Sequence, residues 1–291
     1  WLTGCSKKAG VTMRSNPRPR GVLRASGYHL LAGFVSLLCL LPLAWMVAAS
    51  LRQTGTPLPR TLDILPWPPA WENYVRIFDI VPMGRYLLNS LFVVAIAVPL
   101  TLLTASLAGF GMSQLPRKLR TRLLVLSILL QMVPVTALWL TRFLLFSWAG
   151  LSNSHFALIA PALMGASPLF VLLFYWSFRR VPLEQYESAR LDGATPLTSW
   201  WLVGLPQARP ALLAVGLLAF LFFWNDFINP LLYLKSTRLY TLPVGLMQLQ
   251  ELDKTNWPLL MAASALVTLP PVGVFLWLQR ALLGEPIHGE T

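Results

Sequence analysis

Charged residues are scarce in this chain of 291 residues. Asp, Glu, Lys and Arg together make up 12% of it, against roughly 25% in an ordinary soluble domain. So little charge cannot cover the surface of a water-soluble globule when 56% of the residues are hydrophobic. The same hydrophobic content excludes intrinsic disorder, except at the two ends. The composition therefore predicts a polytopic membrane protein.

The chain also lacks the motifs of soluble enzymes. Two cysteines cannot form a disulfide scaffold, and the three histidines have no metal-ligand partner at a useful spacing. Neither a GxxxxGK[ST] phosphate-binding loop nor a GxSxG nucleophile elbow occurs. We expect no catalytic residue, no metal and no cofactor in this chain, so that any ATP would be hydrolysed by a partner.

Long apolar runs are present instead. A membrane-spanning helix needs roughly 20 mostly apolar residues. Six stretches meet this length, at residues 28–50, 87–111, 123–147, 156–178, 211–234 and 258–279. Backbone polar groups must be satisfied inside lipid, so we predict an all-α fold with six transmembrane helices.

Prolines recur within or beside these stretches, at Pro42, Pro99, Pro134, Pro161, Pro168, Pro270 and Pro271. Membrane helices tolerate proline because neighbouring groups can satisfy the freed carbonyls. Two interpretations stay open, simple kinks and hinges in a moving pathway.

Lys and Arg in the loops predict the orientation of the spans. Residues 1–27, loops 113–122 and 179–210, and Arg280 together carry fifteen of the 23. The loops on the other side carry seven, and Arg142 lies within the third span. Both termini are therefore expected in the cytoplasm. The net charge of +12 fits this topology and contacts with membrane lipid, and its spread over separate loops argues against nucleic acid as a partner.

We expect three parts in the chain: a basic N-terminal arm (1–27), a transmembrane domain (28–283) and a cytoplasmic tail (284–291). The chain begins with Trp, and Met13 is followed by a basic, proline-containing segment. We hypothesise that residues 1–12 are absent from the native protein.

The loop between the fourth and fifth spans is long for a connection. Pro182 can open a helix, LEQYESARL favours one, and Gly193 permits a turn after it. A second short helix is expected at about 196–203, ending near Pro206. Leu183, Tyr186 and Leu191 should lie on one side of the first helix, with Glu187 and Arg190 on another. Such a protrusion could dock into a groove on a partner or rest on lipid headgroups.

YESARLDGAT and the later Leu205–Pro206 pair resemble the EAA loop of maltose-type carbohydrate ABC importer permeases. Ser188 departs from the motif, in which this position is alanine. WNDF at 224–227, LPVGL at 242–246 and MAASALVTLP at 261–270 are similar to the same family, as are LLNSL at 87–91 and QMVP at 131–134. The likeness covers about residues 28–283, and the tail departs from it.

The resemblance implies a type I ABC importer permease fold in a bacterial inner membrane. Its partners would be a second homologous permease, two ATP-binding subunits that use ATP and Mg²⁺, and an extracytoplasmic solute-binding protein. The EAA loop, at residues 182–206, would couple to the ATPase. Its residues would be Tyr186, Glu187, Ser188, Ala189, Asp192, Gly193, Ala194, Leu205 and Pro206. Glu187 would contact the ATPase surface, Ala189 would permit close packing, and Gly193 would make the turn.

Polar residues in the spans are candidates for a translocation path. They are Asn89, Arg142, Trp224, Asn225 and Asp226. Asp226 either pairs across helices to hold the bundle together or lines the path, since carboxylates and amides match sugar hydroxyls. Arg142 either snorkels outward or takes part in gating.

The sequence thus predicts a non-catalytic permease subunit of an ATP-driven importer for a sugar or oligosaccharide. Glycerol phosphate or a polyol is the close alternative as substrate. A stand-alone secondary transporter or channel is the rival of a different class.

Overall fold

The structure, a computed structural model, describes residues 19–57 and 66–283. Every regular element in these ranges is a helix, which confirms the all-α prediction. The expected non-native segment 1–12 and the expected tail 284–291 lie outside the described residues.

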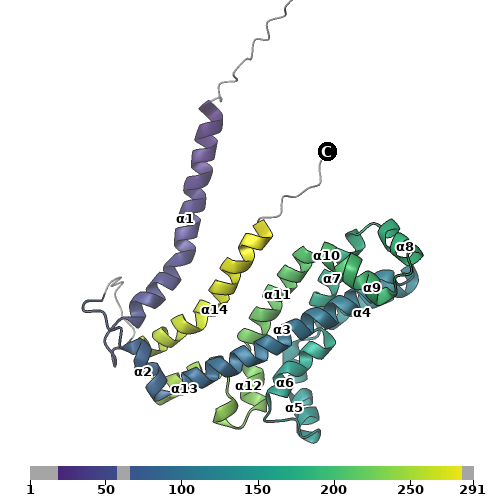
Figure 1. Cartoon of the computed structure of the whole chain (residues 1–291). Coiled ribbons are helices and arrows are strands. Elements are labelled where there is room, and N and C mark those ends of the chain that lie inside the picture. The colour runs from purple at the N-terminus through teal and green to yellow at the C-terminus, as the bar shows by residue number, and fades with distance from the viewer. Residues whose placement is uncertain (1–18, 58–65, 284–291) are drawn as a thin grey trace, which may run out of the picture.

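The helices follow one another from the purple N-terminal end to the yellow C-terminal end of Figure 1. Their bounds are α1 Pro19–Ser50, α2 Asn73–Ile80, α3 Met83–Gln114, α4 Arg117–Met132, η1 Val135–Leu138, α5 Trp139–Trp148, α6 His155–Ile159, η2 Ala160–Met164, α7 Pro168–Arg180, α8 Leu183–Leu191, α9 Pro196–Ser199, η3 Trp200–Gly204, α10 Leu205–Gln207, α11 Arg209–Trp224, α12 Ile228–Tyr233, η4 Thr237–Leu239, α13 Leu242–Leu252 and α14 Trp257–Leu283.

Four segments are long and apolar enough to cross a membrane unaided. They are Tyr28–Ser50, Met83–Gln114, His155–Arg180 and Trp257–Arg280. Two further helix pairs could each form one span, although each is sharply bent, α4 with η1–α5 by 87° and α9–α10 with α11 by 85°. The described residues therefore hold four candidate spans, or up to six if each bent pair counts as one.

The third predicted span is divided at Pro134. The helix α4 ends at Met132, and Val133 takes an extended conformation with φ −71° and ψ 120°. Proline has no N–H to donate and disfavours a helical conformation in the residue before it. The predicted span over 123–147 is therefore bent at Pro134, where a kink or hinge was expected.

The fifth predicted span, 211–234, is also divided. The helix α11 ends at Trp224, and α12 begins at Ile228. Pro230 has no N–H for the carbonyl of Asp226 four residues earlier, so a regular helix cannot run through this point. Asp226 consequently lies in a break between two helices instead of inside one.

The centre of the bundle is formed where α3 packs against α7 and α11. A Cβ atom added at Gly109 of α3 would lie 2.7 Å from the Cβ of Phe174 and 2.9 Å from the backbone nitrogen of Tyr175 in α7. Small residues let helix backbones approach closely in membranes. Gly109 therefore sets the separation between α3 and α7.

The helix α1 stands away from this bundle and packs mainly along α14 (Figure 1). None of the apolar window of Tyr28–Ser50 is buried within the chain. Figure 1 places the first turns of α1, the end of α14 and helix α8 toward the same side of the molecule. The cytoplasmic location of the two termini, which lie outside the described residues, stays a prediction.

Candidate functional site

The first half of the 182–206 loop is a short helix with defined ends. Pro182 precedes α8 in an extended conformation, and α8 runs over Leu183–Leu191. Gly193 has a φ of +85° with open space around its Cα, and the N–H of Ala194 donates to the carbonyl of Ala189 at 2.9 Å. A left-handed residue just past the last turn is a common helix ending. The expected turn at Gly193 is thus observed. Glycine suits this position because of its left-handed φ, and not because a side chain would lack space.

The second half of the loop is helical from Pro196 to Gln207, which extends the expected helix at about 196–203 to an end near Pro206, as predicted. The hydroxyl of Thr195 accepts from the N–H of Thr198 at 3.2 Å and so caps α9. The N–H of Leu205 donates to the carbonyl of Trp200 in π-helical fashion. This wider turn accommodates Pro206, which has no N–H and would clash with the preceding turn of a regular α-helix.

Tyr186 attaches α8 to the membrane bundle. Its side chain is 3% exposed and packs edge-on against Phe110 of α3, with ring centroids 5.7 Å apart. It belongs to one apolar cluster with Phe178 of α7 and Trp200 of η3. Burial raises the pKa of the Tyr186 hydroxyl to about 12, and this hydroxyl has no hydrogen-bond partner among the described residues.

Leu191 does not share this attachment. It is 89% exposed, and Leu183 is 54% exposed, so the expectation that Leu191 lies on the same side of the helix as Tyr186 was wrong. Leu191 lies five residues beyond Tyr186, and at about 100° per residue it points to a different face of the helix. Leu197 and Trp201 of the following helices are also exposed. Leu197 and Trp201 were not singled out from the sequence, although the expected second short helix contains both.

The other predicted coupling residues lie mainly on the outer surface of this loop. Glu187, Ser188, Asp192, Gly193 and Pro206 are exposed, whereas Ala189, Ala194 and Leu205 are half-buried. Arg190 donates to the side-chain oxygen of Gln114 at 3.1 Å, which ties α8 to the end of α3. The loop therefore combines a fixed base with an exposed outer face.

A cleft of about 710 Å³ separates α8 from the α3–α4 connection. Charged residues of both signs line this cleft. Arg117 and Arg120 lie on the wall formed by α4, and Glu184, Glu187 and Arg190 lie on the wall formed by α8. The cleft gives a partner access to the side of α8 that carries Glu187.

The polar residues of the third and fifth spans gather around Asp226. Its carboxylate accepts from the backbone N–H of Asn229 at 3.3 Å and from the Asn229 side-chain amide at 3.0 and 3.1 Å. Asp226 thus caps the first turn of α12. The helix α5, which carries Arg142, packs against α12, which begins just after Asp226. The sequence analysis missed Asn229 and Tyr233, although an asparagine three residues after an aspartate is a recognisable capping spacing.

The remaining path candidates lie in different surroundings. Trp224 is 1% exposed, and its indole N–H donates to the carbonyl of Val267 in α14 at 3.1 Å. The side chain of Asn89 donates to the carbonyls of Arg238 and Tyr240, each at 2.9 Å. These hydrogen bonds give Trp224 and Asn89 a structural role. Asn225, next to Asp226 in the sequence, is exposed. The structure brings Arg142, Asn225 and Asp226 toward one region and leaves Asn89 at a separate contact.

Among the described residues, His, Cys, Asp and Glu form no group of three that could hold a metal ion. The cluster around Asp226 holds one carboxylate and one guanidinium group, which suits hydrogen bonding to a polar, uncharged solute.

The chain is similar to a family of membrane transport components. Residues 97–283 match the family described as the binding-protein-dependent transport system inner membrane component. An arabinooligosaccharide transport permease from Halalkalibacterium halodurans is 31% identical over 253 residues, covering 85% of this chain and 89% of that protein. A trehalose/maltose transport permease from Thermococcus litoralis is 29% identical, covering 86% and 90%. A sulfoquinovosyl glycerol transport permease from Agrobacterium fabrum is 29% identical, covering 81% and 83%.

Solved structures share the fold. A chain of a bacterial ABC transporter that imports alginate superimposes with a TM-score of 0.71 at 20% identity, covering 91% of this chain and 98% of that one. A chain of a methionine ABC transporter gives 0.56 at 15% identity, covering 69% and 94%. The predicted importer-permease fold is confirmed.

Proposed function

Because the chain belongs to the family of binding-protein-dependent transport system inner membrane components, we propose that it is a permease subunit of an ATP-driven importer for a sugar or oligosaccharide. The family places it among multi-pass membrane components that are not themselves catalytic. Relatives named for arabinooligosaccharide, lactose and trehalose or maltose transport support a carbohydrate substrate.

The attachment of α8 is the observation that carries the mechanism. ATP-driven closure of a motor subunit can move the spans only through a well-packed lever. Tyr186 packs α8 against Phe110 of α3, and Arg190 ties it to Gln114. A push on the outer face of α8 is therefore transmitted to α3 and, through its close contact at Gly109, to α7.

The exposed face of the 182–206 loop would dock on an ATP-binding subunit. Glu187 is free to make polar contacts there, and half-buried Ala189 leaves room for close packing. Leu191 and Leu197 add an apolar surface that a groove could cover. Two such subunits, a second permease and a solute-binding protein complete the proposed complex, which would bind ATP and Mg²⁺ outside this chain. The loop and both termini would face the cytoplasm of a bacterial cell.

The translocation path is proposed to pass the break between α11 and α12. Breaks in a membrane helix are tolerated where they are buried in protein or line a cavity. Asn225 and Asp226 lie in this break, and α5, which carries Arg142, packs against α12 at its other end. Carboxylate and amide groups there would exchange hydrogen bonds with sugar hydroxyls.

A polyol or a glycerol derivative is the second candidate substrate, because a relative is named for sulfoquinovosyl glycerol transport. Uptake measured with a panel of sugars, polyols and glycerol phosphate separates these candidates. The assay needs liposomes holding this chain together with its second permease, ATPase and binding protein. Transport by this chain alone without ATP would instead establish a stand-alone transporter or channel.

The coupling role is tested by Glu187→Lys. We expect loss of ATP-dependent uptake and weaker recovery of the ATPase with the purified permease, with membrane insertion unchanged. Glu251→Lys, an equal charge change at the exposed end of α13, is the matched control and should leave ATPase recovery intact. Normal uptake by Glu187→Lys would refute the coupling role.

A further inference from the structure

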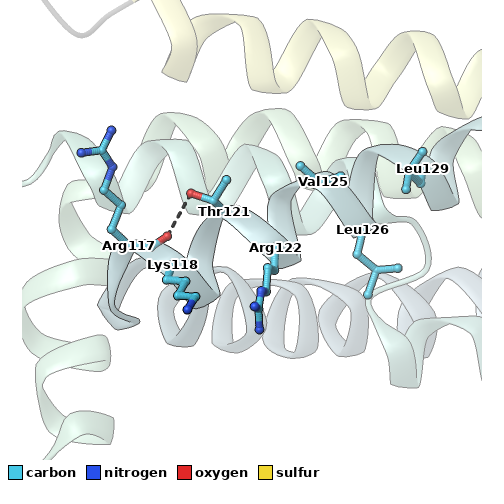
Figure 2. Close-up of a pocket in the computed structure, with 7 residues that line it drawn as sticks. All are labelled: Arg117, Lys118, Thr121, Arg122, Val125, Leu126 and Leu129. Carbon is cyan, nitrogen blue, oxygen red and sulfur yellow. Dashed lines mark hydrogen bonds between the residues drawn. The ribbon is translucent and has the colours of Figure 1, made fainter.

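A shallow groove of about 710 Å³ runs along the surface of α4 (Figure 2). Figure 2 shows Lys118, Arg122 and Leu126 pointing to one side of the helix and Arg117 and Val125 to the other. All the residues that line the groove belong to α4. The groove is distinct from the exposed face of the 182–206 loop and shares only Arg117 with the cleft beside α8.

The two ends of this groove differ in chemistry. Arg117, Lys118 and Arg122 line the end near the start of α4, whereas Val125, Leu126 and Leu129 line the rest. No carboxylate is among the lining residues. Within the described part of the chain, Lys118 and Arg122 make no hydrogen bond or ion pair. Their charges are thus available to an external anion.

The apolar part of the groove is not covered by this chain. No residue of α4 is buried, and Val125, Leu126 and Leu129 are each about half exposed, at 50%, 49% and 54%. From Lys118 to Leu129 the helix rises by about 16 Å. One leaflet of the hydrocarbon core is about 15 Å thick, so the groove has the length of an acyl chain.

We propose that this groove binds an anionic phospholipid. Lys118 and Arg122 hold the headgroup phosphate, with Arg117 at the opposite edge, and an acyl chain lies along Val125, Leu126 and Leu129. Basic residues at the end of a membrane helix attract anionic headgroups. The order of cations followed by apolar residues along one helix matches the order of phosphate and acyl chain in a lipid, which inorganic phosphate does not share.

The test measures lipid affinity of the full-length chain, purified in detergent with the subunits that stay bound. Dioleoyl phosphatidylglycerol is titrated into the delipidated protein and counted by native mass spectrometry. For Lys118→Gln with Arg122→Gln, we expect an affinity loss of roughly 25-fold, the equivalent of about 1 kcal/mol for each cation. Dioleoyl phosphatidylcholine should bind the native chain weakly.

Arg209→Gln with Arg280→Gln is the matched control. It removes the same charge from two exposed arginines outside the groove, and it should leave the affinity within about twofold of the native value. Equal losses in the control and the test variant would mean that net charge alone attracts the lipid, which would overturn the site. Lys118→Arg with Arg122→Lys keeps both charges, so it should retain binding even if the glutamine variant does not fold.

Three further outcomes would also overturn the proposal. Equal binding of dihexanoyl and dioleoyl phosphatidylglycerol, or displacement of the lipid by millimolar inorganic phosphate, would show an anion site without an acyl-chain contact. If the glutamine variant loses its partner permease but keeps its lipid, α4 is an interface between the two permease chains.

Discussion

At the scale of single residues, Tyr186 is attached through its ring and not through its hydroxyl. The hydroxyl has no partner among the described residues, so Tyr186→Phe removes only a buried polar group that forms no bond. Tyr186→Ala instead empties the space beside Phe110, and such a change costs about 3–5 kcal/mol. We expect Tyr186→Phe to retain the unfolding temperature and the ATPase recovery of the native chain, and Tyr186→Ala to lower both.

The same residue gives a pH dependence. Burial raises the pKa of Tyr186 to about 12 from 10.0, so between these values the unfolded chain releases the proton before the folded chain does. The stability from neutral Tyr186 is therefore complete below pH 10 and is lost as the pH rises through 12. The native unfolding temperature should fall more steeply over this interval than that of Tyr186→Phe. Parallel curves would show that the hydroxyl is solvated.

Asp226 has both a capping role and a proposed role in transport, and two substitutions separate them. Asp226→Asn keeps a side-chain oxygen for the N–H of Asn229 but removes the charge beside Arg142. Asp226→Ala removes both, and loss of a helix cap costs about 1 kcal/mol. If the acid lines the path, we expect Asp226→Ala to lower uptake in a complex that still assembles.

Comparison of the two variants by size-exclusion chromatography and uptake decides between the roles. Disassembly of Asp226→Ala, together with native uptake by Asp226→Asn, would show that the residue only holds the bundle together.

At the scale of helices, Gly109 is the point where α3 and α7 approach most closely in the described glycine contacts. An added Cβ would lie 2.9 Å from the backbone of Tyr175, and backbone cannot move aside as a flexible side chain can. We expect Gly109→Ala to lower the unfolding temperature, with a cost of about 1–3 kcal/mol for overpacking.

Gly111→Ala is the control for this change, because nothing lies within 4 Å of its added Cβ in the same helix. It should leave stability equal or higher, since alanine favours a helix interior by roughly 0.5–1 kcal/mol over glycine. The same unfolding temperature for both variants would contradict the proposed close packing.

The sequence predicted the helices better than their bends. Hydropathy located the candidate spans, four in the described residues or up to six if each bent helix pair counts as one, because a span needs a long apolar run. Proline content did not identify the bends: Pro134 divides a span, while Pro42 and Pro99 lie inside continuous helices. Whether a proline breaks a helix depends on whether neighbouring helices satisfy the freed carbonyl, and this is a tertiary property.

In the candidate site, too, the sequence predicted the helix bounds but not which side chains are buried. Pro182 and Gly193 predicted the bounds of α8 from backbone chemistry alone. The burial of Tyr186 and the exposure of Leu191 depend on which face of α8 meets Phe110, and that contact joins residues far apart in the sequence. For the same reason, the sequence could not indicate that Trp224 is enclosed and bonded to Val267 of α14.

At the scale of the whole molecule, the orientation in the membrane decides whether α8 can meet an ATPase. The positive-inside pattern predicts that α8 faces the cytoplasm and that the end of α13 faces outward. Leu191 is 89% exposed, and Lys254 is exposed beyond α13, so each can carry a cysteine without loss of packing. Cys5 and Cys39 are first replaced by serine to remove the native thiols.

Labelling of each introduced cysteine by a membrane-impermeant maleimide, in right-side-out vesicles, then shows which side of the membrane it faces. We expect Lys254→Cys to be labelled in intact vesicles and Leu191→Cys to be labelled only after permeabilisation. The reverse pattern would place α8 outside the cell, where no ATP-driven subunit could reach it. Labelling of both sites in intact vesicles would mean that α8 and the end of α13 are not separated by a membrane span, which would contradict the arrangement of spans itself.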